Sequence, residues 1–260
     1  MRRLILLALA CAGLLLPAAA QQPASIGPVA QIHPPSPAYA FPLDQTFVYQ
    51  AEWKLWNAGQ VTLGLSSTGQ DYRAHGTAES SGVVAVLYPV HDRFQSVFDD
   101  HTLCSQNLAK HTEEGFHKRD TLINFNYSRQ VSVLDETNLK SGQAKHTEKA
   151  IPGCVTDVIS GIFYLASQPL APNATYTFPL NDGGETVTVR AHVEAREQVK
   201  TPAGTFSAIR VAPEAASGVL KERGRVWIWY SDDARHVPVQ MRARMFWGTL
   251  TFSLLRTEKK

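Results

Sequence analysis

The sequence comes nearest to a metal site between residues 111 and 117. His111 and His117 flank Glu113, Glu114 and Gly115. A tight turn at Glu114-Gly115 would place the two imidazoles diagonally across a hairpin, with the Glu113 carboxylate as a third ligand. The spacing matches no established zinc pattern, so an exposed polar turn is the favoured interpretation. We predict no metal-binding residues.

The other residues with chemical potential are Ser80 and the pair Asp232-Asp233. Ser80 lies in a segment that resembles the G-x-S-x-G nucleophile elbow without its first glycine. An elbow requires a strand and then a helix in a parallel sheet, whereas the surrounding pattern is antiparallel. Two acids in a hairpin turn are more often solvated than metal-bound. Since phosphate-cradling and dinucleotide motifs are also missing from the sequence, we predict no catalytic or cofactor-binding residues and a protein that is not an enzyme.

Strand-like alternation dominates the chain after residue 42. Between Phe47 and Leu55, apolar side chains alternate with Gln50, Glu52 and Lys54, which is typical of a half-buried strand. Turn residues at 57–59 then lead to a second alternating run at 61–65, which predicts a hairpin. Similar hairpins are predicted around the turn at 201–204 and around Trp247-Gly248.

The fold class follows from the number of such strands. We expect nine to eleven antiparallel strands, each with one apolar face. The sheet must curl or stack so that these apolar faces are removed from water. The prediction is a mainly β fold: an antiparallel curled sheet or incomplete β-barrel with one or two short helices on its apolar face. One β-rich domain would occupy residues 43–256.

Helical signals are confined to two segments. Thr156 or Asp157 is suited to cap a helix whose apolar residues, from Val158 to Ala166, form a single stripe. Residues 81–88 are a shorter apolar stretch that is compatible with a helical turn before Pro89.

The first forty residues predict export. Arg2 and Arg3 precede an apolar run, Leu4–Leu16, and the small-residue site Ala18-Ala19-Ala20, so residues 1–20 are typical of a signal peptide cleaved after Ala20. Thirteen apolar residues are too few for a membrane span, which needs about 20. Lipidation at Cys11 is the less favoured alternative. Residues 21–42, with six prolines and no charge, are interpreted as a linker. The mature chain is expected in the periplasm or outside the cell, with no transmembrane span.

Export changes the interpretation of the cysteines. Cys104 and Cys154 are the two that remain after cleavage, and thiols in oxidising compartments tend to pair. We therefore predict a Cys104–Cys154 disulfide, with two separate buried thiols as the alternative. A redox function is disfavoured because the sequence has no C-x-x-C motif.

The charge balance disfavours nucleic acid as a partner. Lys and Arg number 25 against 23 for Asp and Glu, and removal of Arg2 and Arg3 would leave the two counts equal. A neutral chain lacks the long-range field that attracts nucleic acid or anionic membranes, although a local patch is compatible with this balance.

Several stretches, in this order, resemble the exported bacterial domain-of-unknown-function family 3108. They are Phe47–Trp53 with Ala58-Gly59, Asp92–Ser96, Asp157–Ser160 with Phe163-Tyr164-Leu165, Thr201–Phe206, and Trp227–Ala234 followed by Val237-Pro238-Val239. The family implies no established chemistry. Its last hairpin is also similar to the periplasmic lipoprotein-carrier fold, a half-barrel that holds acyl chains under a helical lid. This chain differs in having no obvious amphipathic helix before its first strand.

These observations lead to a ligand hypothesis. A lipid or the acyl chain of a lipoprotein would lie between the curled sheet and the helix near Asp157, and its predicted contacts are Trp53, Leu55, Phe163, Met241 and Met245. The alternative is a non-catalytic structural or interaction module of the cell envelope, in which the same residues interdigitate as core. A metal-dependent or serine hydrolase ranks third.

Overall fold

The computed structural model describes residues 30–54, 56–215, 224–245 and 248–259. Within these ranges the chain forms fourteen β-strands and two short helices, α1 (Gly82–Leu87) and α2 (Ser160–Ala166). The strands are β1 (Gln45–Trp53), β2 (Trp56–Ser67), β3 (Asp71–Ser80), β4 (His91–Asp99), β5 (Ser105–Glu114), β6 (His117–Asn126), β7 (Val131–Asn138), β8 (Ala144–Ala150), β9 (Thr175–Leu180), β10 (Val187–Thr201), β11 (Gly204–Ala215), β12 (Arg225–Ser231), β13 (Pro238–Met245) and β14 (Gly248–Lys259).

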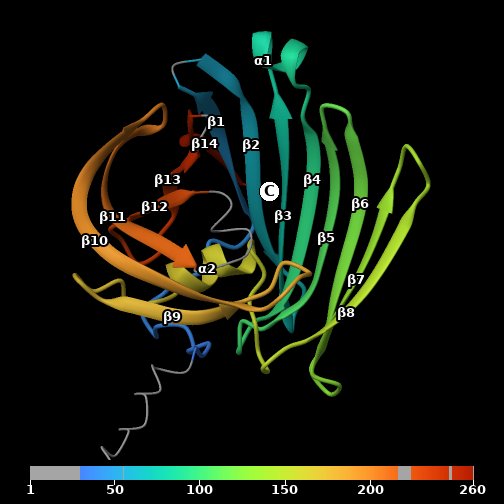
Figure 1. Ribbon diagram of the computed structural model, residues 1–260. Coiled ribbons are helices and arrows are strands. Elements are labelled where there is room, and N and C mark those ends of the chain that lie inside the picture. The colour runs from blue at the N-terminus through green and yellow to red at the C-terminus, as the bar shows by residue number, and fades with distance from the viewer. Residues whose placement is uncertain (1–29, 55, 216–223, 246–247, 260) are drawn as a thin grey trace, which may run out of the picture.

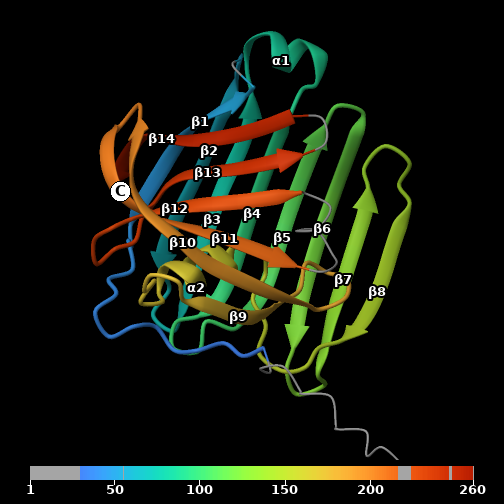
Figure 2. The same cartoon turned by 60° about the vertical axis from the view of Figure 1, so that its left-hand side comes forward.

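All fourteen described strands belong to one antiparallel sheet. Their order is β8-β7-β6-β5-β4-β3-β2-β1-β14-β13-β12-β11-β10-β9, so β1 and β14 meet in the middle and β8 and β9 are the edges. The sheet curls until the strands from β9 to β14 face those from β2 to β6, with α2 inside the curve (Figures 1 and 2). The predicted curled antiparallel sheet is confirmed.

Alternation explains the strands near the core. In β10 the odd-numbered residues from Val187 to Val193 are buried, while the residues between them, such as Arg190, are exposed. The predicted turn at 201–204 connects β10 to β11.

The strand number exceeds the predicted nine to eleven. The extra strands lie in the wing from β5 to β8, where apolar alternation is weak. β8 is the extreme case, because none of its residues is buried. Such strands are held by ladder hydrogen bonds to their neighbours rather than by an apolar face of their own.

The first hairpin turns earlier than the sequence suggested. β1 ends at Trp53 and β2 begins at Trp56, so Asn57 and Gly59 lie within β2, where the pairing register with β1 shifts. Gly59 has φ +149°, and a Cβ there would lie 2.0 Å from the carbonyl oxygen of Glu79. The lack of a side chain at Gly59 therefore allows β2 and β3 to approach closely, and the residue is not part of the turn.

Two apolar cores lie on the sheet. The larger one packs α2 against β1–β4 and β9–β14, and its fully buried side chains include Phe47, Tyr49 and Phe163. The smaller one, centred on Leu108 and Ile123, lies on β5 to β7 in the wing. Val158 and Ile159, just before α2, pack against both cores and join them.

The described part of the proline-rich segment lies against the larger core. Tyr39 and Phe41 pack on it, and the Ala40 amide donates to the carbonyl of Ala234 at 2.9 Å. These aromatic side chains bury more surface than expected of a linker. Residues 1–29, including the predicted signal peptide and Cys11, lie outside the described residues.

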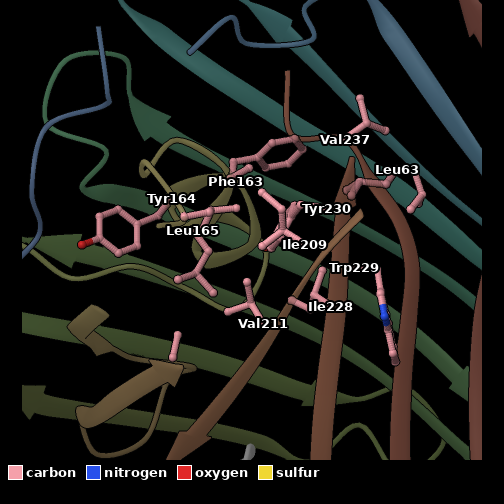
Figure 3. Close-up of a cluster of buried hydrophobic side chains, with 14 of the residues drawn as sticks. Leu63, Phe163, Tyr164, Leu165, Ile209, Val211, Ile228, Trp229, Tyr230 and Val237 are labelled. Atoms are coloured by element: carbon pink, nitrogen blue, oxygen red, sulfur yellow. The ribbon is translucent and has the colours of Figure 1, made fainter. Parts of the chain in front are cut away.

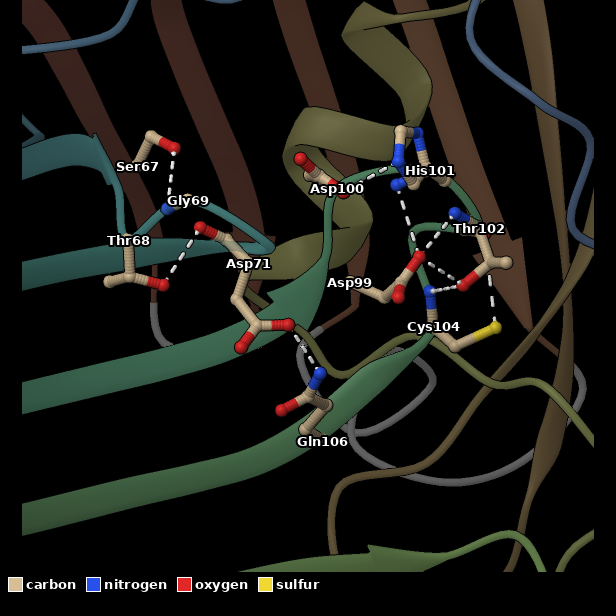
Figure 4. Close-up of polar contacts among 10 residues, drawn as sticks. All are labelled: Ser67, Thr68, Gly69, Asp71, Asp99, Asp100, His101, Thr102, Cys104 and Gln106. Carbon is tan, nitrogen blue, oxygen red and sulfur yellow. Dashed lines mark hydrogen bonds and ion pairs between the residues drawn. The ribbon is translucent and has the colours of Figure 1, made fainter.

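The predicted disulfide is confirmed. Cys104 follows β4, Cys154 precedes α2, and their Cα atoms are 5.1 Å apart. The β4–β5 turn that presents Cys104 is organised by Asp99, whose carboxylate accepts hydrogen bonds from the backbone amides of His101 and Thr102 (Figure 4). In the chain-entropy model, closing a loop of 50 residues stabilises the fold by about 4 kcal/mol.

No helix among the described residues is long and apolar enough to span a membrane.

Candidate ligand-binding pocket

A row of apolar side chains crosses four strands on the inner face of the curled half. Phe252 of β14 pairs with Met241 of β13, Met241 with Ile228 of β12, and Ile228 with Val211 of β11. Residues directly opposite each other in antiparallel strands share a face, so these four form one continuous apolar surface.

A pocket of about 220 Å³ lies between this surface and α2. Nearly all of the residues that line it are apolar, and Arg242 is the charged exception. The wall comprises Val61 from β2; Val158, Gly161, Ile162 and Leu165 from α2 and its preceding turn; Phe178 and Leu180 from β9; Val189 from β10; Pro213 from β11; Val226 and Ile228 from β12; Met241, Arg242 and Ala243 from β13; and Phe252 from β14.

Gly161 is the wall residue without a side chain. It lies inside α2, where glycine is about 1 kcal/mol less favourable than alanine. A Cβ built on Gly161 would lie 3.5 Å from Thr156 Oγ1 and 3.7 Å from both Leu180 Cδ1 and Phe178 Cε2, which is ordinary contact. The sequence therefore leaves room in this wall that a small side chain would fill without a clash.

The middle and the C-terminal end of α2 are held by hydrogen bonds from β12 and from the turn after it. The Tyr230 hydroxyl donates to the carbonyl of Ile162 at 2.9 Å, and His236 Nδ1 donates to the carbonyl of Ala166 at 2.6 Å. Tyr230 and Phe163 both belong to the larger core (Figure 3). The helix is thereby fixed at a set distance from β12 and β13.

The N-terminal end of α2 is held by a buried polar cluster around Asp157. The Asp157 carboxylate accepts hydrogen bonds from the hydroxyls of Ser96 (2.6 Å) and Ser105 (2.7 Å) and from the amides of Ile159 (2.7 Å) and Ser160 (3.0 Å). Burial raises the pKa of Asp157, and the hydrogen bonds that it accepts oppose this shift. The predicted helix start near Asp157 is close to the observed one at Ser160.

The predicted ligand contacts are distributed between pocket, core and strand ends. Met241 lines the pocket. Phe163 is fully buried and stacks on Phe98, with ring centroids 6.1 Å apart. Trp53 and Met245 are the last residues of β1 and β13 and are not among the wall residues. Leu55 lies outside the described residues.

Sequence reasoning missed most of the wall, including Gly161, Ile162 and Phe178. One signal was present: a glycine inside an apolar helical stripe usually has a packing reason. The pairing of α2 with β9 and β12 had no local signal, because these segments are far apart in the chain.

His111 lies in an ion-pair network. His111 Nδ1 lies 2.6 Å from Asp120 and its Nε2 lies 3.3 Å from Glu113, which also pairs with Lys118. The hydrogen bond to Asp120 and then that to Glu113 raise the pKa of His111. No group of three His, Cys, Asp or Glu side chains within the described ranges is placed to hold a metal ion.

The remaining candidate residues have local partners. The Ser80 hydroxyl accepts a hydrogen bond from the amide of Val90 at 2.8 Å. Asp232 pairs with Arg196, while the Asp233 carboxylate accepts the amide of Arg235 in the β12–β13 turn. These contacts shape turns and strand ends.

A curled antiparallel sheet that wraps a short helix, with an apolar pocket beneath that helix, defines a β-barrel-like protein. Within this class the chain belongs to DUF3108, a family of proteins of unknown function, which it matches over residues 48–255.

The architecture recurs in a solved structure. A β-barrel-like protein of the domain-of-unknown-function family DUF1849 from Brucella abortus is similar, with a TM-score of 0.59 and 8% identity, over 85% of this chain and 99% of that chain. A protein with a YmcC-like fold from Bacteroides fragilis aligns over 85% of this chain and 98% of its own, with 9% identity and a TM-score of 0.37. No curated protein matches the chain by sequence. At these identities the first likeness shows a common fold.

Proposed function

We propose that this protein binds an apolar chain, such as part of a lipid or lipoprotein acyl group, in the pocket beneath α2. The observation that carries the proposal is the unfilled, apolar-lined volume of about 220 Å³. It exceeds the roughly 150 Å³ of an engineered apolar cavity that takes up benzene. It is smaller than the roughly 300–1,000 Å³ of sites for drug-sized ligands.

The size and chemistry of the wall narrow the ligand class. Apolar side chains offer no hydrogen bonds to a polar group, so a buried amide or carboxylate would lose its hydration without compensation. The thioether of Met241 adapts to irregular apolar shapes. A slender hydrocarbon segment therefore suits the pocket better than a bulky or polar ligand, and the similarity of the last hairpin to lipoprotein carriers supports the same choice.

The alternative is a structural or interaction module of the cell envelope. The aromatic packing around α2 favours it, because Phe98, Phe163, Tyr164 and Phe178 fill much of the interior. In that case the pocket would be a packing defect without affinity for ligands. Neither role requires catalysis, and we propose a non-enzymatic function.

A binding experiment separates the two roles. A fluorescent fatty-acid analogue titrated into delipidated protein should bind saturably at micromolar concentration. Gly161→Leu, which adds a side chain next to the pocket wall, should abolish binding. Gly184→Leu is the matched control, because a Cβ at Gly184 meets open space. No saturable binding by the wild type, or equal binding by both variants, would support the structural role.

Export to the periplasm is the cellular setting of this proposal. The disulfide is consistent with an oxidising compartment. N-terminal sequencing of the mature protein should give Gln21, whereas a diacylated Cys11 would replace the soluble carrier with a lipid-anchored one. Native mass spectrometry of periplasmic material should then reveal a co-purifying lipid.

A further inference from the structure

Large apolar side chains are exposed at one end of the sheet. The described residues include eight large hydrophobic side chains that are exposed, and six of them lie in or directly beside three neighbouring connections between strands. We call these six the apolar rim. They are Trp56, Val83, Val86, Leu87, Tyr88 and Phe116, and Val86 and Phe116 are 84% and 86% exposed. This concentration is unlike the scattered exposure of single apolar residues on ordinary surfaces.

The antiparallel order of the strands brings the rim together. The β1–β2 turn, the β3–β4 connection with α1, and the β5–β6 turn all lie at the same end of neighbouring strands. The Ser81 amide donates to the carbonyl of Ala58 in β2 at 2.9 Å, and the Gly115 amide donates to the carbonyl of Pro89 at 2.8 Å. Helix α1 projects beyond the strand ends (Figures 1 and 2).

Helix α1 receives little stabilisation from packing against the rest of the protein. It has six residues, none of them buried, and its N-terminus has no side-chain cap. Three of those residues are valines, which are weaker helix formers than alanine or leucine. A helix this short is not stable by itself. Because none of its apolar side chains is buried, they do not stabilise the folded protein either, and their presence needs another explanation.

Cationic side chains border the rim. Lys54, in the β1–β2 turn, is exposed, and the Lys140 ammonium lies 5.3 Å from the centroid of the Phe116 ring. Among the described residues, neither Lys54 nor Lys140 forms an ion pair with a carboxylate. Both ammonium groups lie over aromatic rings, Lys54 over Trp53 and Lys140 over Phe116. An apolar tip flanked by such cations is complementary to a surface of hydrocarbon and anionic headgroups.

Acidic side chains also lie at this end. Glu79, near the end of β3, is exposed, Glu113 is paired with Lys118, and Asp92 and Glu114 are partly exposed. Burial raises the pKa of Asp92 to about 6, and the adjacent Glu114 charge adds to this shift.

We propose that the apolar rim docks this protein on the surface of a phospholipid bilayer that contains anionic lipid. The rim protrudes as separate tips and mixes aromatic with aliphatic side chains, as segments that enter the headgroup region do. A protein partner would instead need a pocketed surface to receive each tip.

The rim is close to the pocket. The carbonyl of Ala58 accepts a hydrogen bond from Ser81, directly before α1. Ala58 and the pocket residue Val61 are three residues apart in β2, a distance of about 10 Å along the strand. A bilayer docked at the rim would therefore bring its hydrocarbon chains close to the pocket. The docking itself does not depend on the proposed function, because it uses side chains outside the pocket wall.

Vesicle co-sedimentation tests the docking. Wild-type protein should bind vesicles of phosphatidylethanolamine and phosphatidylglycerol more strongly than vesicles of phosphatidylcholine. The double variant Val86→Asp/Leu87→Asp should lose at least about tenfold in partitioning, because each apolar side chain removed from the interface costs roughly a factor of ten. Leu122→Asp is the matched control: Leu122 is also exposed but lies in the middle of β6.

The outcomes are distinct. Loss of binding in the double variant, with wild-type binding in Leu122→Asp and unchanged thermal unfolding in both, would support docking through the rim. No binding by the wild type would overturn it and leave a protein partner as the occupant. Equal losses in the double variant and in Leu122→Asp would also overturn it. Fatty-acid binding measured without vesicles tests the pocket separately, so either proposal can fail alone.

Discussion

Replacing Gly161 by alanine tests whether the wall of the pocket is as open as the structure shows. The added methyl group would meet neighbours at 3.5 to 3.7 Å, which requires no displacement. Since Gly161 lies inside α2 and its φ is not positive, alanine also suits the backbone. We therefore expect Gly161→Ala to stabilise the protein, although most core substitutions destabilise.

The expected gain has two parts. Replacing a helical glycine by alanine is worth about 1 kcal/mol in free energy of unfolding. Moving a methyl group from water into the pocket adds up to about 0.8 kcal/mol. The sum, about 1 to 2 kcal/mol, corresponds to a rise of roughly 2 to 8 °C in Tm for a domain of this size.

Thermal and urea unfolding measure this gain, and Gly76→Ala provides the contrast. A Cβ on Gly76 would lie 2.2 Å from the carbonyl oxygen of Thr62 in the neighbouring strand, so the same substitution must destabilise there. A loss of more than about 1 kcal/mol in Gly161→Ala would show that α2 is packed tightly against the sheet. This result would refute the interpretation that the pocket wall is open at Gly161.

Three further predictions concern the pocket, the buried carboxylate and pH. Met241→Ala only enlarges the pocket, so urea unfolding should show a loss of less than about 2 kcal/mol, against about 2–5 kcal/mol for Ile209→Ala in the filled core. Asp157→Ala leaves the buried hydroxyls of Ser96 and Ser105 without their acceptor and should cost about 3 kcal/mol or more by calorimetry, with Asp157→Asn costing less. Because the pKa of Asp92 is raised from 3.8 to about 6, the folded state binds the proton more tightly, and stability should fall as pH rises from about 4 through 6. Asp92→Asn should flatten that fall, by on the order of 1 kcal/mol after solvent screening, in Tm measured across this range.

The strands around the main core could be predicted because their residues carry the signal locally. In β10, apolar and polar side chains alternate with one face buried, and turn residues mark the end of the strand. The disulfide was also predictable, since only two cysteines remain after the expected cleavage. In these cases a few neighbouring residues, or a simple count, determine the answer.

Other features depend on contacts that no local pattern reports. β8 is a strand because β7 offers it a ladder of hydrogen bonds, although its own residues are polar. Gly59 looked like a turn residue, yet it serves the approach of β3 to β2. The pocket wall combines α2 with residues of β2 and of the strands from β9 to β14, so its composition follows from curvature of the sheet rather than from any one segment.

The position of α2 explains how an apolar pocket can persist in this fold. An unfilled apolar volume of about 220 Å³ deprives its lining side chains of packing contacts, which favours inward collapse of any mobile wall. Here the mobile candidate is α2, and it is held at both ends. Asp157 ties its start to β4 and β5, Tyr230 ties Ile162 to β12, and His236 ties the last residue, Ala166, to the turn after β12. The Cys104–Cys154 disulfide restrains the segment before it. Because closing the pocket would break these bonds, the polar anchors around α2 keep the space beneath it open.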